Sequence, residues 1–197
     1  MSVALWMVLA LVLLGIFWAV GAYNRLVRLK NAIANAFGQI DVQLKRRYDL
    51  IPNLVEVARK YLAHESQTLE AVIAARNQAR SAEQSAASSP LNAGALGALA
   101  GAEQMLGGAL GRLFAVAEAY PELKADQTMR ELSEELSSTE NRVGFARQAY
   151  NDHVLEFNDA AAQFPTLVIA RLFGFGTQAM LESTTSEVER QAVRIEI

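Results

Sequence analysis

Apolar and polar positions divide the chain into one uninterrupted apolar stretch, a long helix-like repeat and a second, shorter apolar stretch. Residues 3–22 (VALWMVLALVLLGIFWAVGA) contain no charged residue. A helix of that length spans about 30 Å, the thickness of one hydrocarbon core. Trp6 lies near one end, and Trp18 and Tyr23 lie near the other, as interfacial anchors do. The pattern predicts a transmembrane anchor over residues 1–23.

A cleaved signal peptide is the alternative interpretation of this stretch, because residues 20–22 (VGA) offer small side chains for cleavage. No Lys or Arg precedes the stretch, however, and it is longer than a usual signal core. We therefore expect the helix to be retained. Basic residues follow it at Arg25, Arg28 and Lys30. The positive-inside rule then predicts that the N-terminus lies outside and the body in the cytoplasm. A periplasmic or extracellular body is the alternative.

Beyond the anchor, apolar positions recur at alternating steps of three and four residues, the repeat of helices that pack along one another. The repeat is punctuated by Asp49 and Pro52, by the SAASSP segment at residues 85–90, and by Pro121. It predicts an all-α fold, an antiparallel up-and-down four-helix bundle over residues 24–165. We expect its helices at about 24–48, 50–86, 92–118 and 124–164.

The first connection of this bundle depends on residues 45–52 (KRRYDLIP). Basic residues favour a helix C-terminus, and Asp49 suits an N-cap. Pro52 would then stand in the first turn of a new helix, where its missing N–H costs little. We therefore favour a tight hairpin here. The alternative is one long helix kinked at Pro52, because the apolar repeat continues in phase from Leu44 to Leu62.

The third helix falls in a tract rich in glycine and alanine, residues 91–111 (LNAGALGALAGAEQMLGGALG). Its leucines keep the three-four spacing, so we expect a loosely held helix that is the most mobile part of the bundle. The glycines either permit close helix packing or weaken the helix. They do not form a phosphate loop, because no strand precedes a GxGxxG pattern.

Polar residues interrupt or flank the apolar seams of the first and last helices. They form a candidate buried network of seven side chains: Asn31, Asn35, Asp41, Glu140, Arg147, Asn151 and Asn158. Early positions of one antiparallel helix meet late positions of the other, so the network predicts Asn31 near Asn158 and Asp41 near Arg147. A solvated polar face is the alternative.

The second apolar stretch, residues 166–181 (TLVIARLFGFGTQAML), carries one charge. In an up-and-down bundle the last helix returns to the membrane, which makes Leu167, Phe173 and Phe175 candidates for contact with the bilayer surface. Arg25, Arg28 and Lys30 would contact the same surface. Covering the open end of the bundle core explains the stretch equally well. Residues 182–197 are a polar tail that we expect to be disordered or loosely docked.

Charge supports a membrane surface over nucleic acid as the partner. Residues 23–50 hold six Lys or Arg against two acids, whereas residues 51–197 hold twelve against nineteen. The basic part therefore adjoins the apolar stretch, whereas a nucleic-acid-binding body would carry its own basic face. The 197 residues include no cysteine, which excludes disulfides, thiolate metal sites and cysteine nucleophiles.

Catalytic candidates are few. The motif HESQT at residues 64–68 lacks the second histidine that an HExxH zinc protease needs. No di-iron ligand set of the bundle type is possible, because it needs the motif Glu-x-x-His twice and neither of the two histidines stands in that motif. The remaining candidate pairs are His64 with Glu65, Asp152 with His153, and Glu140 with Arg147. We expect a protein that is not an enzyme and that carries no cofactor or metal.

The chain resembles the LemA family over nearly all of residues 1–175. The stretches that carry the resemblance are YNRLVRLKNAIANAFGQIDVQLKRRYDLIPNLVE, HESQTLEAVIAAR, YPELKAD, ELSSTENRVGFARQAYND and FNDAAAQFP. The resemblance implies an N-terminal membrane anchor and an antiparallel four-helix bundle. Some members are linked to membrane organisation, including magnetosome membrane formation, and others neighbour membrane proteases.

These observations lead to two hypotheses of function. The first is a membrane-anchored helical scaffold or adaptor, self-associating, whose partners are the lipid bilayer, copies of itself and another membrane protein. The second is a regulator or sensor of a membrane protease or transport system, in which residues 85–111 would move.

Overall fold

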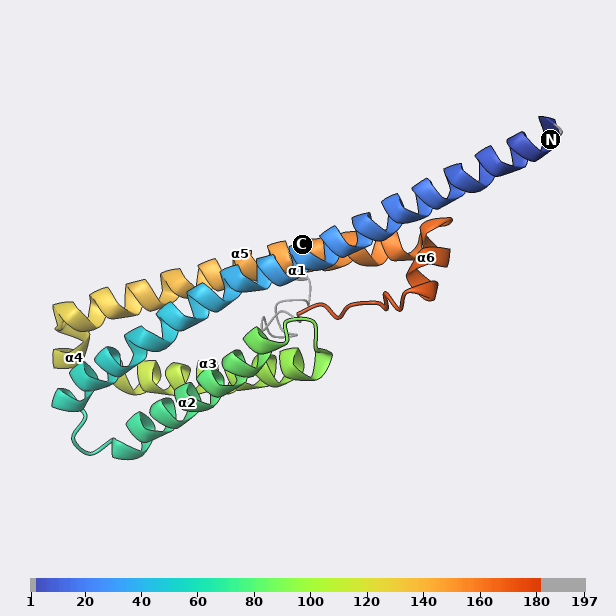
Figure 1. Ribbon diagram of the computed structural model, residues 1–197. Coiled ribbons are helices and arrows are strands. Elements are labelled where there is room, and N and C mark those ends of the chain that lie inside the picture. The colour runs from blue at the N-terminus through green and yellow to red at the C-terminus, as the bar shows by residue number, and fades with distance from the viewer. Residues whose placement is uncertain (1–2, 182–197) are drawn as a thin grey trace, which may run out of the picture.

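The computed structural model describes residues 3–181, which form helices and connecting loops without a strand (Figure 1). The helices are α1 (Val3–Tyr61), α2 (Ser66–Ser88), α3 (Ala93–Ala117), α4 (Pro121–Ala125), α5 (Gln127–Ala162) and α6 (Thr166–Leu172). The bundle consists of α2, α3, α5 and the C-terminal two-thirds of α1. The N-terminal third of α1 projects from it alone. The predicted all-α fold, an apolar N-terminal helix followed by a bundle, is confirmed.

The four long helices do not pack equally. Helix α1 packs most extensively on α5, α2 packs on α3, and α1 also packs on α2. Helices α3 and α5 scarcely touch, so the bundle is open along that side. The core follows the three-four repeat: Ile33, Phe37 and Ile40 of α1 are buried against α5, where the rings of Phe37 and Tyr150 meet edge-on at 6.2 Å.

The predicted hairpin at Asp49 and Pro52 is wrong. Helix α1 continues through both residues to Tyr61, and the chain turns at residues 62–65 instead. The second helix therefore begins at Ser66 rather than near residue 50. Asp49 is no N-cap, because its side chain is 75% exposed in the helix interior. The alternative of one continuous helix is the observed one.

A contact from α2 explains how α1 accommodates the proline. Pro52 has no N–H to donate to the carbonyl of Tyr48, one turn earlier. Arg76 supplies the missing donor, since its Nε donates to the Tyr48 oxygen at 3.0 Å. The Arg76 guanidinium also lies 4.0 Å from the Asp49 carboxylate. Pro52 thus creates a docking point for α2 rather than a helix end.

Candidate functional site

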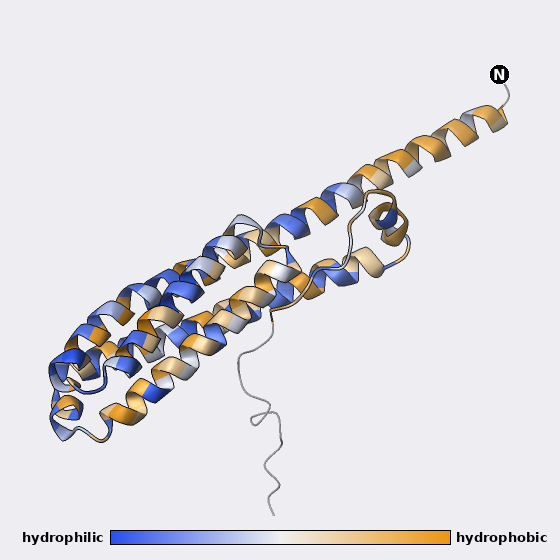
Figure 2. Ribbon diagram, turned by 90° about the horizontal axis from the view of Figure 1, so that it is seen from below, coloured by the Kyte–Doolittle hydropathy of each residue, from blue (hydrophilic) through white to orange (hydrophobic). Residues whose placement is uncertain are grey.

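The first candidate site is the end of the molecule where α1 leaves the bundle. Among the described residues, α1 is the helix long and apolar enough to cross a membrane. Large apolar side chains from Val3 to Val20 are exposed, and Figure 2 shows them as a continuous hydrophobic stretch beyond the bundle. Tyr23, at the end of this stretch, contacts residues of the C-terminal part of the chain.

Helix α6 and the turn after it pack beside this exit point. The Tyr23 ring meets the rings of Phe173 and Phe175 edge-on, at 4.9 Å and 5.5 Å between centroids. Phe175 also contacts Phe157 of α5, with ring centroids 6.4 Å apart. The predicted membrane-contact residues differ in exposure: Phe173 is exposed, whereas Leu167 and Phe175 are half-buried. Phe175 therefore serves mainly to hold the turn on the bundle.

Four large apolar side chains around α6 remain exposed, and we call them the apolar collar: Phe164, Val168, Leu172 and Phe173. Phe164 is 84% exposed and Leu172 is 74% exposed. The predicted basic contacts Arg25, Arg28 and Lys30 are also exposed, within about two helical turns of Tyr23. The apolar collar and these three cations therefore lie at the same end of the bundle, where the apolar part of α1 ends.

The predicted pairs of the polar network do not form. Asn31 and Asn35 are exposed, and the Asn158 amide binds the backbone of Gln178 rather than Asn31. Asp41 forms an ion pair with Lys45 at 2.7 Å, one turn along the same helix, and lies beside Glu83 of α2. The prediction that Asp41 would meet Arg147 of α5 is wrong because Asp41 points toward α2.

Asn151 and Asn158 hold the segment after α6 against α5. The Asn158 side chain accepts from the Gln178 N–H at 2.8 Å and donates to its carbonyl at 3.0 Å. The Asn151 side chain makes the same pair of bonds with Leu181, at 2.9 Å each. Both asparagines therefore bind backbone groups of the segment after α6, not the side chains of the first helix that we predicted.

A second polar site, which sequence reasoning missed, lies at the centre of the bundle. The Nη1 of Arg47 donates to Glu103 of α3 at 2.9 Å, and the Tyr48 hydroxyl donates to the other Glu103 oxygen at 2.6 Å. The three residues form the Arg47–Glu103 cluster. Burial, followed by the nearby Glu103 charge, raises the pKa of Tyr48 well above its ordinary value. Glu103 is the one charged residue in the tract 91–111, a signal that could have drawn attention to it.

Asp41 and Glu83 form a second buried acidic site, the carboxyl pair. Glu83 is 1% exposed, and burial together with the neighbouring Asp41 raises its pKa to about 7, against the opposing charges of Lys45 and Arg80. Burial also acts to raise the pKa of Asp41, but hydrogen bonds from Glu83 and Lys45 outweigh it and lower that pKa. The pair therefore holds one proton near neutral pH, carried by Glu83.

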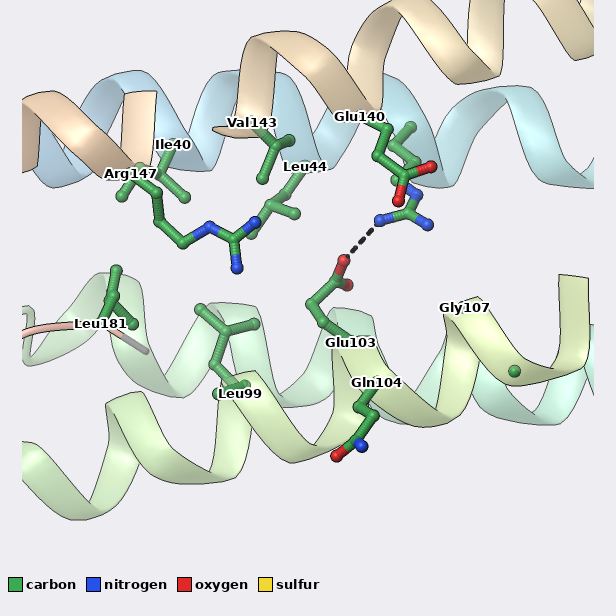
Figure 3. Close-up of a pocket in the computed structure, with 13 residues that line it drawn as sticks. Ile40, Leu44, Leu99, Glu103, Gln104, Gly107, Glu140, Val143, Arg147 and Leu181 are labelled. Carbon is green, nitrogen blue, oxygen red and sulfur yellow. Dashed lines mark hydrogen bonds and ion pairs between the residues drawn. The ribbon is translucent and has the colours of Figure 1, made fainter. Parts of the chain in front are cut away.

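A cleft opens along the loosely packed side of the bundle, between α3 and α5, with α1 as its floor (Figure 3). It encloses about 420 Å³. Glu140 and Arg147, two of the predicted network residues, line its α5 wall, and Leu181 lies at one end. Burial lowers the pKa of Arg147 from its ordinary value. We call this space the α3–α5 cleft.

Comparison with known proteins agrees with the architecture. The sequence pattern of the LemA family matches residues 36–197. The magnetosome protein MamQ of Magnetospirillum gryphiswaldense is 26% identical over 78% of this chain and 62% of its own length. MamQ 1 of Paramagnetospirillum magneticum is 27% identical over the same shares. The protein LemA of Metamycoplasma hominis is 28% identical over 90% of this chain and 76% of its own.

The chain thus spans less than two-thirds of the length of the MamQ relatives that it matches. None of these names describes an enzyme. The apolar N-terminal helix and the magnetosome relatives together indicate a membrane-associated protein. Since the family match covers most of its length, the chain belongs to the LemA family.

Proposed function

We propose that this protein is a non-enzymatic scaffold or adaptor, anchored in the membrane by α1, that self-associates and organises the membrane or a membrane protein complex. The observation that carries the proposal is the position of the apolar collar. Phe173 of the collar contacts Tyr23, where the apolar part of α1 ends, and the other three exposed side chains lie in or just before α6, which packs on α1. A bilayer crossed by α1 brings its interface to the collar, where aromatic and aliphatic side chains are favoured.

The basic residues add an electrostatic contribution at the same level. Arg25, Arg28 and Lys30 are exposed on the first turns of α1 beyond Tyr23, within reach of anionic headgroups. The same charges orient the anchor with its N-terminus outside and the bundle in the cytoplasm of a bacterial cell. A bundle held at the membrane surface in this way exposes its other faces to copies of itself or to another membrane protein.

Exposed apolar residues on the body support self-association. Phe145 of α5 is 73% exposed, and Val42 of α1 is 56% exposed. The antiparallel register that pairs Phe37 with Tyr150 places Val42 and Phe145 at the same level of the bundle. Apolar side chains exposed at one level of two adjacent helices are typical of a surface that meets another protein.

The collar is tested by lipid quenching in the full-length protein. The chain has no cysteine, so Leu172→Cys provides one site for a polarity-sensitive fluorophore in anionic nanodiscs. We expect brominated lipids to quench this label strongly. They should not quench the same label at Ser137→Cys, an exposed site on the distal half of α5. Equal quenching at the two sites would contradict membrane contact by the collar.

Self-association is tested by the mass of the full-length protein in native nanodiscs. A scaffold should appear as an oligomer, and Phe145→Ser should lower its mass, whereas the neighbouring exposed Gln148→Ser should not. A monomer that retains another membrane protein would favour the adaptor. A monomer that retains nothing would contradict both forms of the proposal.

The alternative function, a regulator or sensor subunit of a membrane protease or transport system, draws support from the carboxyl pair. Glu83 changes its charge near neutral pH, between two helices of the bundle. A sensor should change its bound partners between pH 6 and pH 8. Proximity labelling in the native membrane at both pH values separates it from a scaffold, whose neighbours should stay the same.

A further inference from the structure

The segment from Gly176 to Leu181 lies in an extended conformation along α5, held there through its backbone. The side chains of Asn158 and Asn151 each bind both the N–H and the C=O of one residue, Gln178 and Leu181 respectively. Because side-chain amides bind main-chain groups, this mode of binding depends little on the sequence of the bound strand.

The spacing of the two asparagines matches an extended strand. Seven residues of α-helix separate Asn151 from Asn158, a rise of about 10.5 Å. Three residues separate Gln178 from Leu181, which in an extended chain span about 10 Å. Bonds at both positions can therefore form together without strain. The strand runs antiparallel to α5, so its continuation points from Asn151 toward Arg147 and Glu140.

The strand ends, among the described residues, at the mouth of the α3–α5 cleft. Leu181 lines the cleft at one end, and Gly107 and Gly108 of α3 lie further along it (Figure 3). A Cβ atom added at either glycine would meet nothing within 4 Å. Glycine inside a helix costs about 1 kcal/mol relative to alanine. Packing among the described residues therefore does not require these two glycines, and they leave room for a polypeptide.

A buried donor in the cleft also lacks an acceptor. The Arg47 side chain is 6% exposed, and its Nε has no hydrogen-bond partner among the described residues, although its Nη1 binds Glu103. A buried donor left without an acceptor costs about 1–3 kcal/mol. A backbone carbonyl of a strand lying in the cleft would provide one. Gln104 and Glu140 line the same space and can bind the other main-chain groups.

We propose that the α3–α5 cleft is the docking site for this chain's own C-terminal segment, residues 182–197, which continues the strand begun at residues 176–181. Sixteen extended residues reach about 50 Å, more than the roughly 36 Å of α5 between Asn151 and Gln127. The lining of the cleft balances Arg47 and Arg147 against Glu103 and Glu140, so the feature that selects this occupant is its covalent continuity with Leu181 at the mouth of the cleft. This proposal does not depend on the scaffold function.

The register follows from the alternation of side chains along a strand. Leu181 lines the cleft, so a docked strand would turn every second side chain after it toward the cleft, beginning with Ser183. Two residues of strand advance about 7 Å, roughly the rise from Asn151 to Arg147 on α5. The proposal therefore predicts Ser183 beside the part of the cleft lined by Ala100 of α3.

Cysteine crosslinking in the full-length protein tests this placement. The variant pair Ser183→Cys with Ala100→Cys should form an intramolecular disulfide about tenfold faster than Ser183→Cys with Ala98→Cys, because docking raises the effective concentration at one face only. Ala98 is the matched control, since it is an exposed alanine on the same helix that does not line the cleft. Equal rates for the two pairs would overturn the proposal. A disulfide between two protein molecules would also overturn it, assigning the cleft to the tail of a second copy.

Hydrogen exchange gives a readout that needs no cysteine. Amides of residues 182–187 should be protected in the wild-type protein, and Asn151→Ala should abolish that protection by releasing Leu181. Asn141→Ala, an exposed asparagine on the same helix, should leave it intact. Unprotected amides in the wild-type protein, or equal protection in both variants, would contradict docking.

Discussion

The Arg47–Glu103 cluster and the carboxyl pair each place a glutamate in a buried position against α1, but the groups that surround the two glutamates differ. Glu103 accepts one hydrogen bond on each of its oxygens, from Arg47 and from Tyr48. Glu83 faces another carboxyl group, and the Lys45 ammonium lies 3.8 Å away on an exposed side chain. One buried acid therefore has an arginine as its partner, whereas the other shares its site with a second acid. Burial and that second acid raise the pKa of Glu83 to about 7.

Removing the partner of Glu103 should produce the largest effect. Arg47→Met leaves the Glu103 carboxyl group with its hydrogen bond from Tyr48 but without its ion pair, and breaking a buried ion pair in this way costs about 3–5 kcal/mol. The measurement is chemical unfolding of the full-length protein in detergent, followed by circular dichroism. Arg46→Ala is the control, because Arg46 and Glu135 pair on the surface and such pairs contribute at most about 1 kcal/mol. Equal losses of unfolding free energy in the two variants would show that the buried pair contributes no more to stability than the surface pair.

Glu83→Gln should abolish the contribution of Glu83 to the pH dependence of stability. The folded pKa of Glu83 is about 7, raised from the ordinary 4.5. The folded state therefore binds the extra proton between these values, and stability falls as the pH rises from about 4.5 to about 7. At pH 8 the glutamine variant should be more stable than the wild type by about 1–3 kcal/mol, since its amide donates to Asp41 without charge.

The pKa of Asp41 is shifted downward, opposite to that of Glu83, so the two acids affect stability in different pH ranges. Its lowered pKa stabilises the fold above the ordinary pKa of an aspartate, and this contribution is lost as the pH falls through the folded value. Stability profiles of wild type and Glu83→Gln between pH 5 and pH 8 isolate the glutamate. Parallel profiles would contradict the assignment of the proton to Glu83.

The carbonyl of Tyr48 connects the Arg47–Glu103 cluster to α2, and Arg76→Ala tests that link. The variant leaves the Tyr48 oxygen without a donor, at a cost of about 1–2 kcal/mol. Pro52→Ala restores an N–H to the same carbonyl, so the double variant should recover most of the loss. A double-mutant cycle by chemical unfolding measures the coupling. Additive effects would show that Arg76 does not compensate for Pro52.

Lys45→Met should have the smallest effect on stability. Lys45 is exposed, and its ion pair with Asp41 is screened by solvent. The variant should instead shift the pH profile of the carboxyl pair, because Lys45 favours the ionised form of both acids. A loss of unfolding free energy as large as that of Arg47→Met would contradict the proposed difference between the Arg47–Glu103 cluster and the carboxyl pair.

The sequence predicts the helices well because their apolar repeat is local and long. The seam from Ile33 to Leu44 and the charge-free stretch 3–22 correspond to the core and to the exposed part of α1. The prediction of a hairpin at Asp49 and Pro52 was wrong because the deciding contact is not local in the sequence. Pro52 is compatible with a continuous helix because Arg76, distant along the chain, donates to the carbonyl it leaves unpaired.

Polar partners were harder to predict than apolar ones. Asn151 and Asn158 were predicted to meet side chains of the first helix, but they bind main-chain groups of residues 181 and 178, and a backbone partner cannot be recognised from the sequence. Glu103 escaped notice because it stands in a tract dominated by glycine and alanine. The burial of a single charge depends on which helix faces it, and that is a property of the assembled bundle.

The continuity of α1 through Pro52 has a mechanical consequence. A single helix joins the apolar stretch to the far end of the bundle, about 57 Å beyond residue 23. With no hinge between anchor and body, each degree of tilt moves that distal end by about 1 Å. A spanning helix that is longer than the hydrocarbon core adapts by tilting. Because α1 is continuous, any such tilt of its apolar part would be passed rigidly to the end of the bundle at Tyr61.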